Sequence, residues 1–297
     1  MRMFIGGTES SMFRASTQLK SLGEGEVRRG RTFFKRFSLS VVLPLLMLPV
    51  LLLTGCEKAA PPDDMADARK AAGERRYGEA EKLLERYLRL NPEGEERWEA
   101  WQRLLQITLD VRGDDKAGME LLEAMYLEFG MDGDKAREVL VRLGGLLETA
   151  RRWDRAADAW RKLIEVPDLS GDENARAHRR LARIHASRRE FGIAEDVLHQ
   201  CLQLKATDAR RAECLYDLAD VQMSMEHFAR GADLARQILA MPGAERDLKA
   251  LAGFMLGDAL EQQGKTAEAL AAFEAVRETY PNELVVETRI RQLRKGR

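Results

Sequence analysis

The side chains that most often carry catalysis or metal binding are sparse in this chain of 297 residues. The four histidines are His178, His185, His199 and His227. His178 and His185 are seven positions apart, which puts them on one face of a helix, whereas a helix-borne metal site such as H-E-x-x-H pairs histidines four apart. We therefore expect the histidines to serve packing or surface roles, and we expect no metal site.

Other catalytic patterns are also missing from the sequence. No glycine-rich phosphate loop is followed by Lys and Ser or Thr, and no G-x-S-x-G element occurs. The glycine pair Gly144-Gly145 is typical of a helix crossing, and the acidic pair Asp114-Asp115 is typical of a turn, where Asp is favoured for backbone reasons. We predict no catalytic residues, no cofactor and no enzymatic activity.

Residues 253–281 predict two amphipathic helices joined by a short turn. Gly264 separates the helices and Pro281 ends the second one. The residues that share a face at three- and four-residue spacing are Leu256, Gly257 and Leu260 in the first helix and Ala269, Phe273 and Val276 in the second. Such a pair cannot bury both apolar faces alone, so it needs copies alongside.

Five more copies are present. The small residues equivalent to Ala269 are Ala80, Ala117, Ala156, Ala194 and Gly231, and the intervals along the series to Ala269 are 37, 39, 38, 37 and 38 residues. The copies resemble the tetratricopeptide repeat, W-x2-L-G-x2-Y followed by A-x3-F and P, although Gly253 departs at the large first position. The resemblance implies an all-α solenoid of about six helix-turn-helix repeats over residues 66–281, and six copies in register favour it over an irregular helical bundle.

The residue types within the copies suggest how the helices pack. Small residues are expected where two helices cross, and large ones opposite them. The small set is Gly144, Ala182, Ala219 and Gly257, and the large set is Trp160, Leu198 and Phe273.

Residues 282–297 predict a capping helix that begins after Asn282. Its apolar residues are Leu284, Val285, Ile290 and Leu293. Its basic end, residues 289–297, is expected to be a solvated face, and attraction to acidic phospholipid head groups is the alternative.

The segment 1–55 reads as a targeting signal rather than as part of the fold. A basic region precedes an apolar run, Phe37 to Leu53, and the run ends in Leu53-Thr54-Gly55-Cys56. These four residues resemble the bacterial lipobox, which implies cleavage before Cys56 and acylation of that cysteine. An uncleaved anchor and ordinary secretory cleavage are the alternatives. The leader is unusually long, and a later start codon, which would leave residues 1–27 untranslated, is the alternative to its full length.

Residues 56–65 form a polar tether with Pro61-Pro62. Removal of residues 1–55, which hold 8 basic and 3 acidic residues of the chain's 48 and 49, leaves 40 and 46, a net charge of −6. An acidic chain is a poor match for nucleic acid, whose binding rests on many Lys and Arg contacts to phosphate. We expect no nucleic-acid partner.

The family resemblance places ligands on the concave surface lined by the first helix of each repeat. The predicted groove residues are Arg176, Arg179, Arg183, Tyr216, Asp220, Met223, Phe254 and Asp258. Three arginines along one helix face predict a basic stripe, so the expected ligand is a peptide with an acidic part followed by apolar and basic residues. The alternative is an ordinary solvated face, and the family's Lys and Asn carboxylate clamp is not matched.

These features predict a scaffold for protein–protein interaction in the bacterial cell envelope, anchored through lipidated Cys56 and facing the periplasm. Glu57 is not the aspartate that retains some lipoproteins at the inner membrane, which favours the outer membrane. The partner would be a protein or peptide in outer-membrane or secretion-system assembly, and recruitment of cell-wall or polysaccharide enzymes is the alternative. Cys201 and Cys214 are expected as buried free thiols, with a disulfide between them as the alternative.

Overall fold

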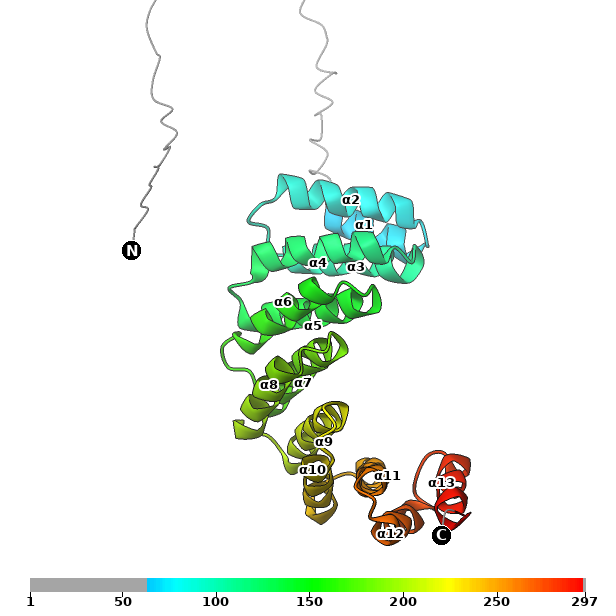
Figure 1. The fold of residues 1–297 in the computed structure, drawn as a ribbon. Helices are drawn as coiled ribbons and strands as arrows, with labels where there is room; N and C mark the ends of the chain where they lie inside the picture. The colour runs from blue at the N-terminus through cyan, green and yellow to red at the C-terminus, as the bar shows by residue number, and fades with distance from the viewer. Residues whose placement is uncertain (1–62, 296–297) are drawn as a thin grey trace, which may run out of the picture. The chain divides into compact units, whose positions relative to one another are not determined.

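The computed structural model describes residues 63–295. The predicted signal segment, Cys56 and most of the tether lie outside this range. Residues 63–295 fold into helices only, which confirms the all-α solenoid (Figure 1). The elements are α1 (Asp64–Gly73), α2 (Tyr77–Leu90), α3 (Arg97–Gln106), the π-helix η1 (Ile107–Val111), α4 (Asp115–Phe129), α5 (Gly133–Thr149), α6 (Trp153–Ile164), α7 (Gly171–Ser187), α8 (Phe191–Gln203), α9 (Asp208–Ser224), α10 (Phe228–Ala240), α11 (Arg246–Gln262), α12 (Thr266–Val276) and α13 (Glu283–Lys295).

Helices α1 to α12 form six consecutive pairs, each of which is one unit, and α13 follows the sixth pair. The first helix of a unit packs on the second, and the second packs on the first helix of the next unit, as α7, α8 and α9 do. First helices also touch directly, α7 with α9 and α9 with α11. Because each helix buries its apolar face against sequence neighbours, the core follows the stacking of the units as a series of buried clusters, the longest of which runs from Leu105 to Val221. None of the helices among residues 63–295 is long and apolar enough to cross a membrane.

The turn inside each unit has the same backbone geometry. One residue per turn has a positive φ of 54–73°. The six residues are Arg75, Gly113, Arg151, Arg189, Glu226 and Gly264. The turn residues are 37 or 38 positions apart, and in each unit a buried small residue follows five positions later. This matches the predicted small residues in five units, but in the second unit the residue is Gly118, which packs on Leu109, and the predicted Ala117 is only half-buried. Gly264 lies in the turn that ends α11, as expected. Only two of the six are glycine, so four turns hold a side chain in a left-handed conformation that favours glycine.

The small residues of the pattern make room for rings. A Cβ on Gly144 would lie 2.7 Å from Cε2 of Trp160, and one on Gly257 would lie 2.6 Å from Cε1 of Phe273. The prediction had two backbones crossing there; the structure instead places an aromatic ring of the same unit over each glycine. Gly253 stands where the repeat pattern has a large residue. The space that a large side chain would take is occupied by Val276, whose Cγ1 would be 2.3 Å from a Cβ added to Gly253.

Both ends of the array differ in detail from the sequence prediction. Helix α1 begins at Asp64, inside the predicted tether, because the Asp63 carboxylate caps it by accepting from the Ala66 N–H at 3.0 Å and because Met65 is fully buried. At the other end Asn282 accepts from the Val285 N–H at 3.3 Å, as predicted for the start of α13. The buried face of α13 is Val286, Ile290 and Leu293, while Leu284 and Val285 are exposed, contrary to the predicted apolar face.

Candidate partner-binding groove

Polar side-chain contacts join the first helices of neighbouring units. They are Arg69 Nε to Glu99 Oε1 at 2.9 Å, Gln102 Nε2 to Glu138 Oε1 at 3.2 Å, Arg137 Nη1 to Glu173 Oε1 at 3.2 Å, Arg179 Nε to Asp217 Oδ2 at 2.6 Å, and, from α13, Arg289 Nη2 to Asp258 Oδ1 at 2.6 Å. We call this series the inter-unit ladder. Arg69 and then Arg103 lower the pKa of Glu99 to about 2, so this acid stays charged. Within residues 63–295 the ladder has no rung between α9 and α11.

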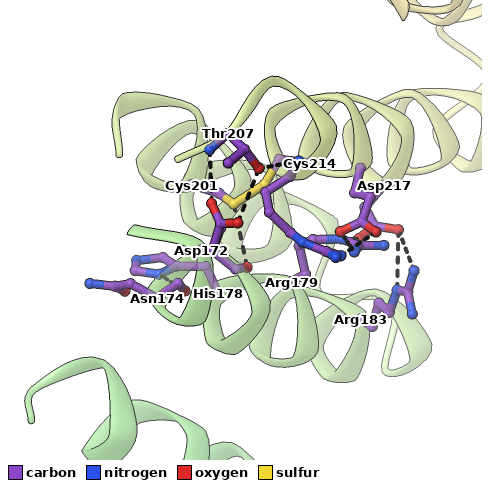
Figure 2. The surroundings of a disulfide bond; sticks show 12 residues. Asp172, Asn174, His178, Arg179, Arg183, Cys201, Thr207, Cys214 and Asp217 are labelled. Atoms are coloured by element: carbon purple, nitrogen blue, oxygen red, sulfur yellow. Dashed lines mark hydrogen bonds and ion pairs between the residues drawn. A yellow bond between two sulfur atoms is a disulfide. The ribbon is translucent and has the colours of Figure 1, made fainter. Parts of the chain in front are cut away.

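The predicted basic stripe on α7 is largely neutralised by α9. Arg179 binds both Asp217 and Glu213, and Arg183 binds Oδ1 of Asp217 at 2.9 Å from Nη2 (Figure 2). Arg176 is exposed, and no ion pair of Arg176 occurs among the described residues. The three charges therefore do not form a common anion site. Sequence reasoning missed Asp217, although it lies 38 residues after Arg179, one repeat period later.

A cavity of about 290 Å³ lies between α7, α8 and α9. Its apolar lining is Ala182, Ala186, Leu198 and Val221, and its polar lining is Arg183, Tyr216, Asp217 and Asp220. Two predicted groove residues, Tyr216 and Asp220, therefore meet at one opening, together with Arg183. Asp220 is exposed and takes part in no ion pair within the described range.

Two groups at this cavity, Asp220 and Tyr216, have raised pKa values, first because they are partly desolvated and then because negative charge lies nearby. Asp220 is open to solvent on one side, but the surrounding protein partly desolvates its carboxylate; this desolvation, followed by repulsion from Asp217, raises the pKa of Asp220, and Arg183 offsets only part of the effect. Burial, followed by the Asp220 charge, raises the pKa of the Tyr216 hydroxyl. The hydroxyl of Tyr280 lies near enough to contribute to the same rise.

The sixth unit adds aromatic surface. Phe254 stacks on Tyr280, with ring centroids 4.5 Å apart, and meets the edge of Phe273 at 5.1 Å. Phe254, Tyr280 and Tyr216 are all half-buried. We call Tyr216, Asp220, Phe254 and Tyr280 the α9–α11 patch. Sequence reasoning did not select Tyr280, because it follows the end of α12 and falls outside the helical periodicity.

Two predicted groove residues have other tasks. Asp258 is bound by Arg289 of α13, so it belongs to the inter-unit ladder. Met223 is half-buried, and its Sδ would lie 2.8 Å from a Cβ on Gly231 of α10. Met223 therefore packs within its own unit, and the glycine in the usual alanine position of that unit makes room for it.

Cys201 and Cys214 are joined by a disulfide, which corrects the expectation of buried free thiols (Figure 2). The end of α8 and the start of α9 bring the two Cα atoms to 6.2 Å, within the range that a disulfide spans. Both cysteines are buried beside Ala175 at the junction of the fourth and fifth units. The bond thus covalently joins the two units that Arg179 and Asp217 also connect.

The histidines lie in packing and surface positions, as predicted. Nδ1 of His178 lies 2.9 Å from the Asn174 carbonyl oxygen, and that of His185 lies 2.6 Å from Glu190 Oε2. His227 contacts Gln222, and His199 is exposed. Among residues 63–295 no three His, Cys, Asp or Glu side chains are grouped to hold a metal ion.

A larger cavity, about 770 Å³, lies between α3, η1 and α5. Leu105, Leu109, Val141 and Leu146 form its apolar part, and Gly145 opens onto it with nothing within 4 Å of an added Cβ. The two glycines of Gly144-Gly145 therefore serve different purposes, since Gly144 packs on Trp160. Sequence reasoning missed this cavity, because the π-helical turn η1 that borders it leaves no periodic signal.

Comparison with known proteins agrees with this architecture. A family model described as tetratricopeptide repeat matches residues 141–209 and 216–283. Among solved structures, a MamA protein is similar at 19% identity with a TM-score of 0.50, over 62% of this chain and 92% of that one. PilF of Pseudomonas aeruginosa is 14% identical, over 79% of this chain and 96% of that one, with a TM-score of 0.46. YrrB, described as a TPR protein with an unusual peptide-binding site, is 19% identical, over 59% of this chain and 84% of that one, with a TM-score of 0.45. No curated protein sequence matches the chain.

Proposed function

Because the chain is a tetratricopeptide repeat protein, we propose that it is a membrane-anchored scaffold that holds a protein or peptide partner in the bacterial cell envelope. Proteins of this fold generally bind other proteins and are not enzymes. The partner would take part in assembly of an outer-membrane or secretion structure. The binding surface would be the face formed by the first helices, at the α9–α11 patch.

The observation that supports this position is that, among residues 63–295, no side-chain hydrogen bond or ion pair joins α9 to α11. Polar contacts join the first helices of the other units, whereas α9 and the sixth unit carry half-buried rings, Tyr216 on α9 and the stacked pair Phe254 and Tyr280. Half-buried aromatic side chains supply large contact area with little loss of conformational entropy, which is why such residues dominate interface energetics. We expect affinity to come mainly from these three rings.

The anchor would be Cys56, after cleavage at Leu53-Thr54-Gly55-Cys56. One acyl chain gives only marginal membrane binding, whereas the several chains of a mature lipoprotein give stable anchoring. The Cys201–Cys214 disulfide supports export, because disulfides persist in oxidising compartments such as the periplasm. Glu57 in place of aspartate favours the outer membrane.

The anchor is tested with Cys56→Ser in cells fed a labelled fatty acid. The wild-type chain should carry the label and sediment with membranes. The variant should carry none and should be soluble or unprocessed. Label retained by Cys56→Ser would contradict lipidation at this residue.

The groove is tested by pull-down from crosslinked envelopes with a Tyr216→Ala, Phe254→Leu double variant. Leucine keeps apolar volume against Phe273, so folding should survive, which a melting curve checks. Tyr126→Ala on α4 is the matched control, since Tyr126 is also half-buried but lies on a second helix. We expect the double variant to lose the partner and the Tyr126→Ala control to keep it. If the double variant also keeps the partner, the α9–α11 patch is not the binding surface.

The same pull-down identifies the pathway. Subunits of β-barrel assembly or secretion would agree with the proposal, and recovery of cell-wall synthases alone would contradict the assembly role. Charge reversal at Arg179 is unsuitable as a probe of binding, because Arg179 holds two units together. Arg176→Glu is the better test of groove charge, since Arg176 is exposed.

A further inference from the structure

We propose that the cavity between α7 and α9 receives a lysine or arginine side chain of the partner, with Asp220 as its counter-ion. This inference rests on the proposed binding function and specifies the chemistry of the partner. It replaces the acidic ligand segment predicted from the α7 arginines, because Arg179 and Arg183 already have carboxylate partners within the chain.

The first argument is charge. The cavity is lined by one cation, Arg183, and two carboxylates, Asp217 and Asp220. Both oxygens of Asp217 are occupied, Oδ2 by Arg179 and Oδ1 by Arg183. Asp220 is the carboxylate left over, so a single positive charge from a partner would balance the lining.

The second argument is shape. The apolar part of the cavity lining consists of small or aliphatic side chains, Ala182, Ala186, Leu198 and Val221. Lysine and arginine lay their methylene stems along such surfaces and keep the charge at the rim. The ring of Tyr216 lies at the same opening, where an aromatic face can attract a cation.

The third argument is the cost of other occupants. An acidic side chain would face Asp217 and Asp220, and a purely apolar one would remove water from Asp220 without replacing its hydrogen bonds. Tyr216 at the opening and the stacked rings of Phe254 and Tyr280 on the sixth unit offer apolar surface to further residues of the same partner. The preferred sequence is therefore a basic residue next to apolar or aromatic ones.

The test is selection of phage-displayed random peptides on the purified full chain in detergent. Selected peptides should be enriched in Lys or Arg flanked by apolar residues. A selected peptide should bind Asp220→Asn about tenfold more weakly than wild type, the effect of one good charge contact. Asp196→Asn, the same change at an exposed position of α8, is the matched control and should leave affinity unchanged.

A second measurement makes the assignment to Asp220 specific. Norleucine in place of the selected lysine should weaken binding to wild type about tenfold but should change binding to Asp220→Asn little, because the two changes remove one contact. Peptides without basic enrichment, or wild-type affinity in Asp220→Asn, would overturn the cation site. Undiminished binding of every selected peptide to the Tyr216→Ala, Phe254→Leu variant would overturn the groove itself, and failure to select any peptide would overturn both.

Discussion

Asp217 on α9 accepts a hydrogen bond from Nε of Arg179 on α7 at 2.6 Å, and both side chains are largely removed from solvent, 8% and 14% exposed. The same carboxylate also binds Arg183. Since α7 and α9 are the first helices of successive units, this contact contributes to the stacking of the fourth unit on the fifth, together with the α8–α9 packing and the Cys201–Cys214 bond. It has a measurable consequence for stability.

We expect Asp217→Ala to lower the free energy of unfolding by about 2–3 kcal/mol, because it leaves two arginines without this carboxylate in a partly desolvated site. The control is Asp158→Ala, which removes the exposed partner of Arg161 and should cost no more than about 0.5 kcal/mol. Urea unfolding followed by helical circular dichroism measures both changes. Equal losses would mean that the Asp217 contact does not stabilise the stacking.

Replacement of Gly144 and of Gly145, adjacent residues of α5, by alanine should change the stability of the chain in opposite directions. A methyl on Gly144 would lie 2.7 Å from the Trp160 ring, whereas one on Gly145 meets nothing within 4 Å. Gly144→Ala should therefore destabilise by about 1–3 kcal/mol through overpacking. Gly145→Ala should stabilise by up to about 1 kcal/mol, because alanine favours a helix. Thermal melting distinguishes them, and shifts of the same sign would refute this packing; Gly257→Ala, under Phe273, should follow Gly144→Ala.

The fold could be predicted because its signals are local and repeated. The spacing of Ala156, Ala194 and Gly231 reports a helical turn geometry that recurs in every unit, as the positive-φ residues Arg189 and Glu226 confirm. Helix boundaries were less certain where a cap decides them. The prolines and acidic residues before residue 66 predicted an extended tether. Helix α1 nevertheless begins at Asp64, because the Asp63 carboxylate accepts a capping hydrogen bond from the Ala66 N–H.

The candidate site could be predicted only in part, because its properties depend on contacts between units. Periodicity correctly put Tyr216 and Asp220 on one face, and the structure brings them to one cavity. It could not tell that Arg179 would be bound by Asp217, since the rotation of one helix against the next decides which charges meet. The sequence could not decide between free thiols and a disulfide for Cys201 and Cys214, because the answer depends on a distance between two units.

The left-handed turn residues predict a stabilising substitution. Glu226 has a φ of 61°, which favours glycine, and it occupies the position of Gly264 in the next unit. Glu226→Gly should stabilise the chain by about 0.5–1 kcal/mol by relieving this conformation. Gly264→Ala should cost about 1 kcal/mol for the converse reason. Melting temperatures that move in the opposite directions would show that side-chain contacts, not the backbone, decide these turns.

His178 predicts a pH dependence of stability. Burial lowers its pKa, and the Asn174 carbonyl and the Gln200 side chain offset only part of that effect. As pH falls below the unfolded value of about 6.5, the unfolded chain binds more protons at this position than the folded chain, so stability is lost on acidification. When the pH is lowered from about 7.5 to about 5.5, the melting temperature of His178→Gln should therefore fall less than that of wild type. Exposed His199→Gln should behave like wild type, and a wild-type slope in His178→Gln would exclude His178 as the source.

The Cys201–Cys214 bond predicts a redox dependence of stability at the junction of the fourth and fifth units. The bond closes a loop with a sequence separation of 13, so reduction should lower the free energy of unfolding by about 2–3 kcal/mol. The measurement is melting with and without reductant, and the control is a Cys201→Ala, Cys214→Ala double variant, which should not respond to reductant. In denatured wild-type protein, thiol reagents should label Cys201 and Cys214 only after reduction. Labelling of both without reductant would show that the two thiols are free in the native chain and that the junction is held by non-covalent contacts only.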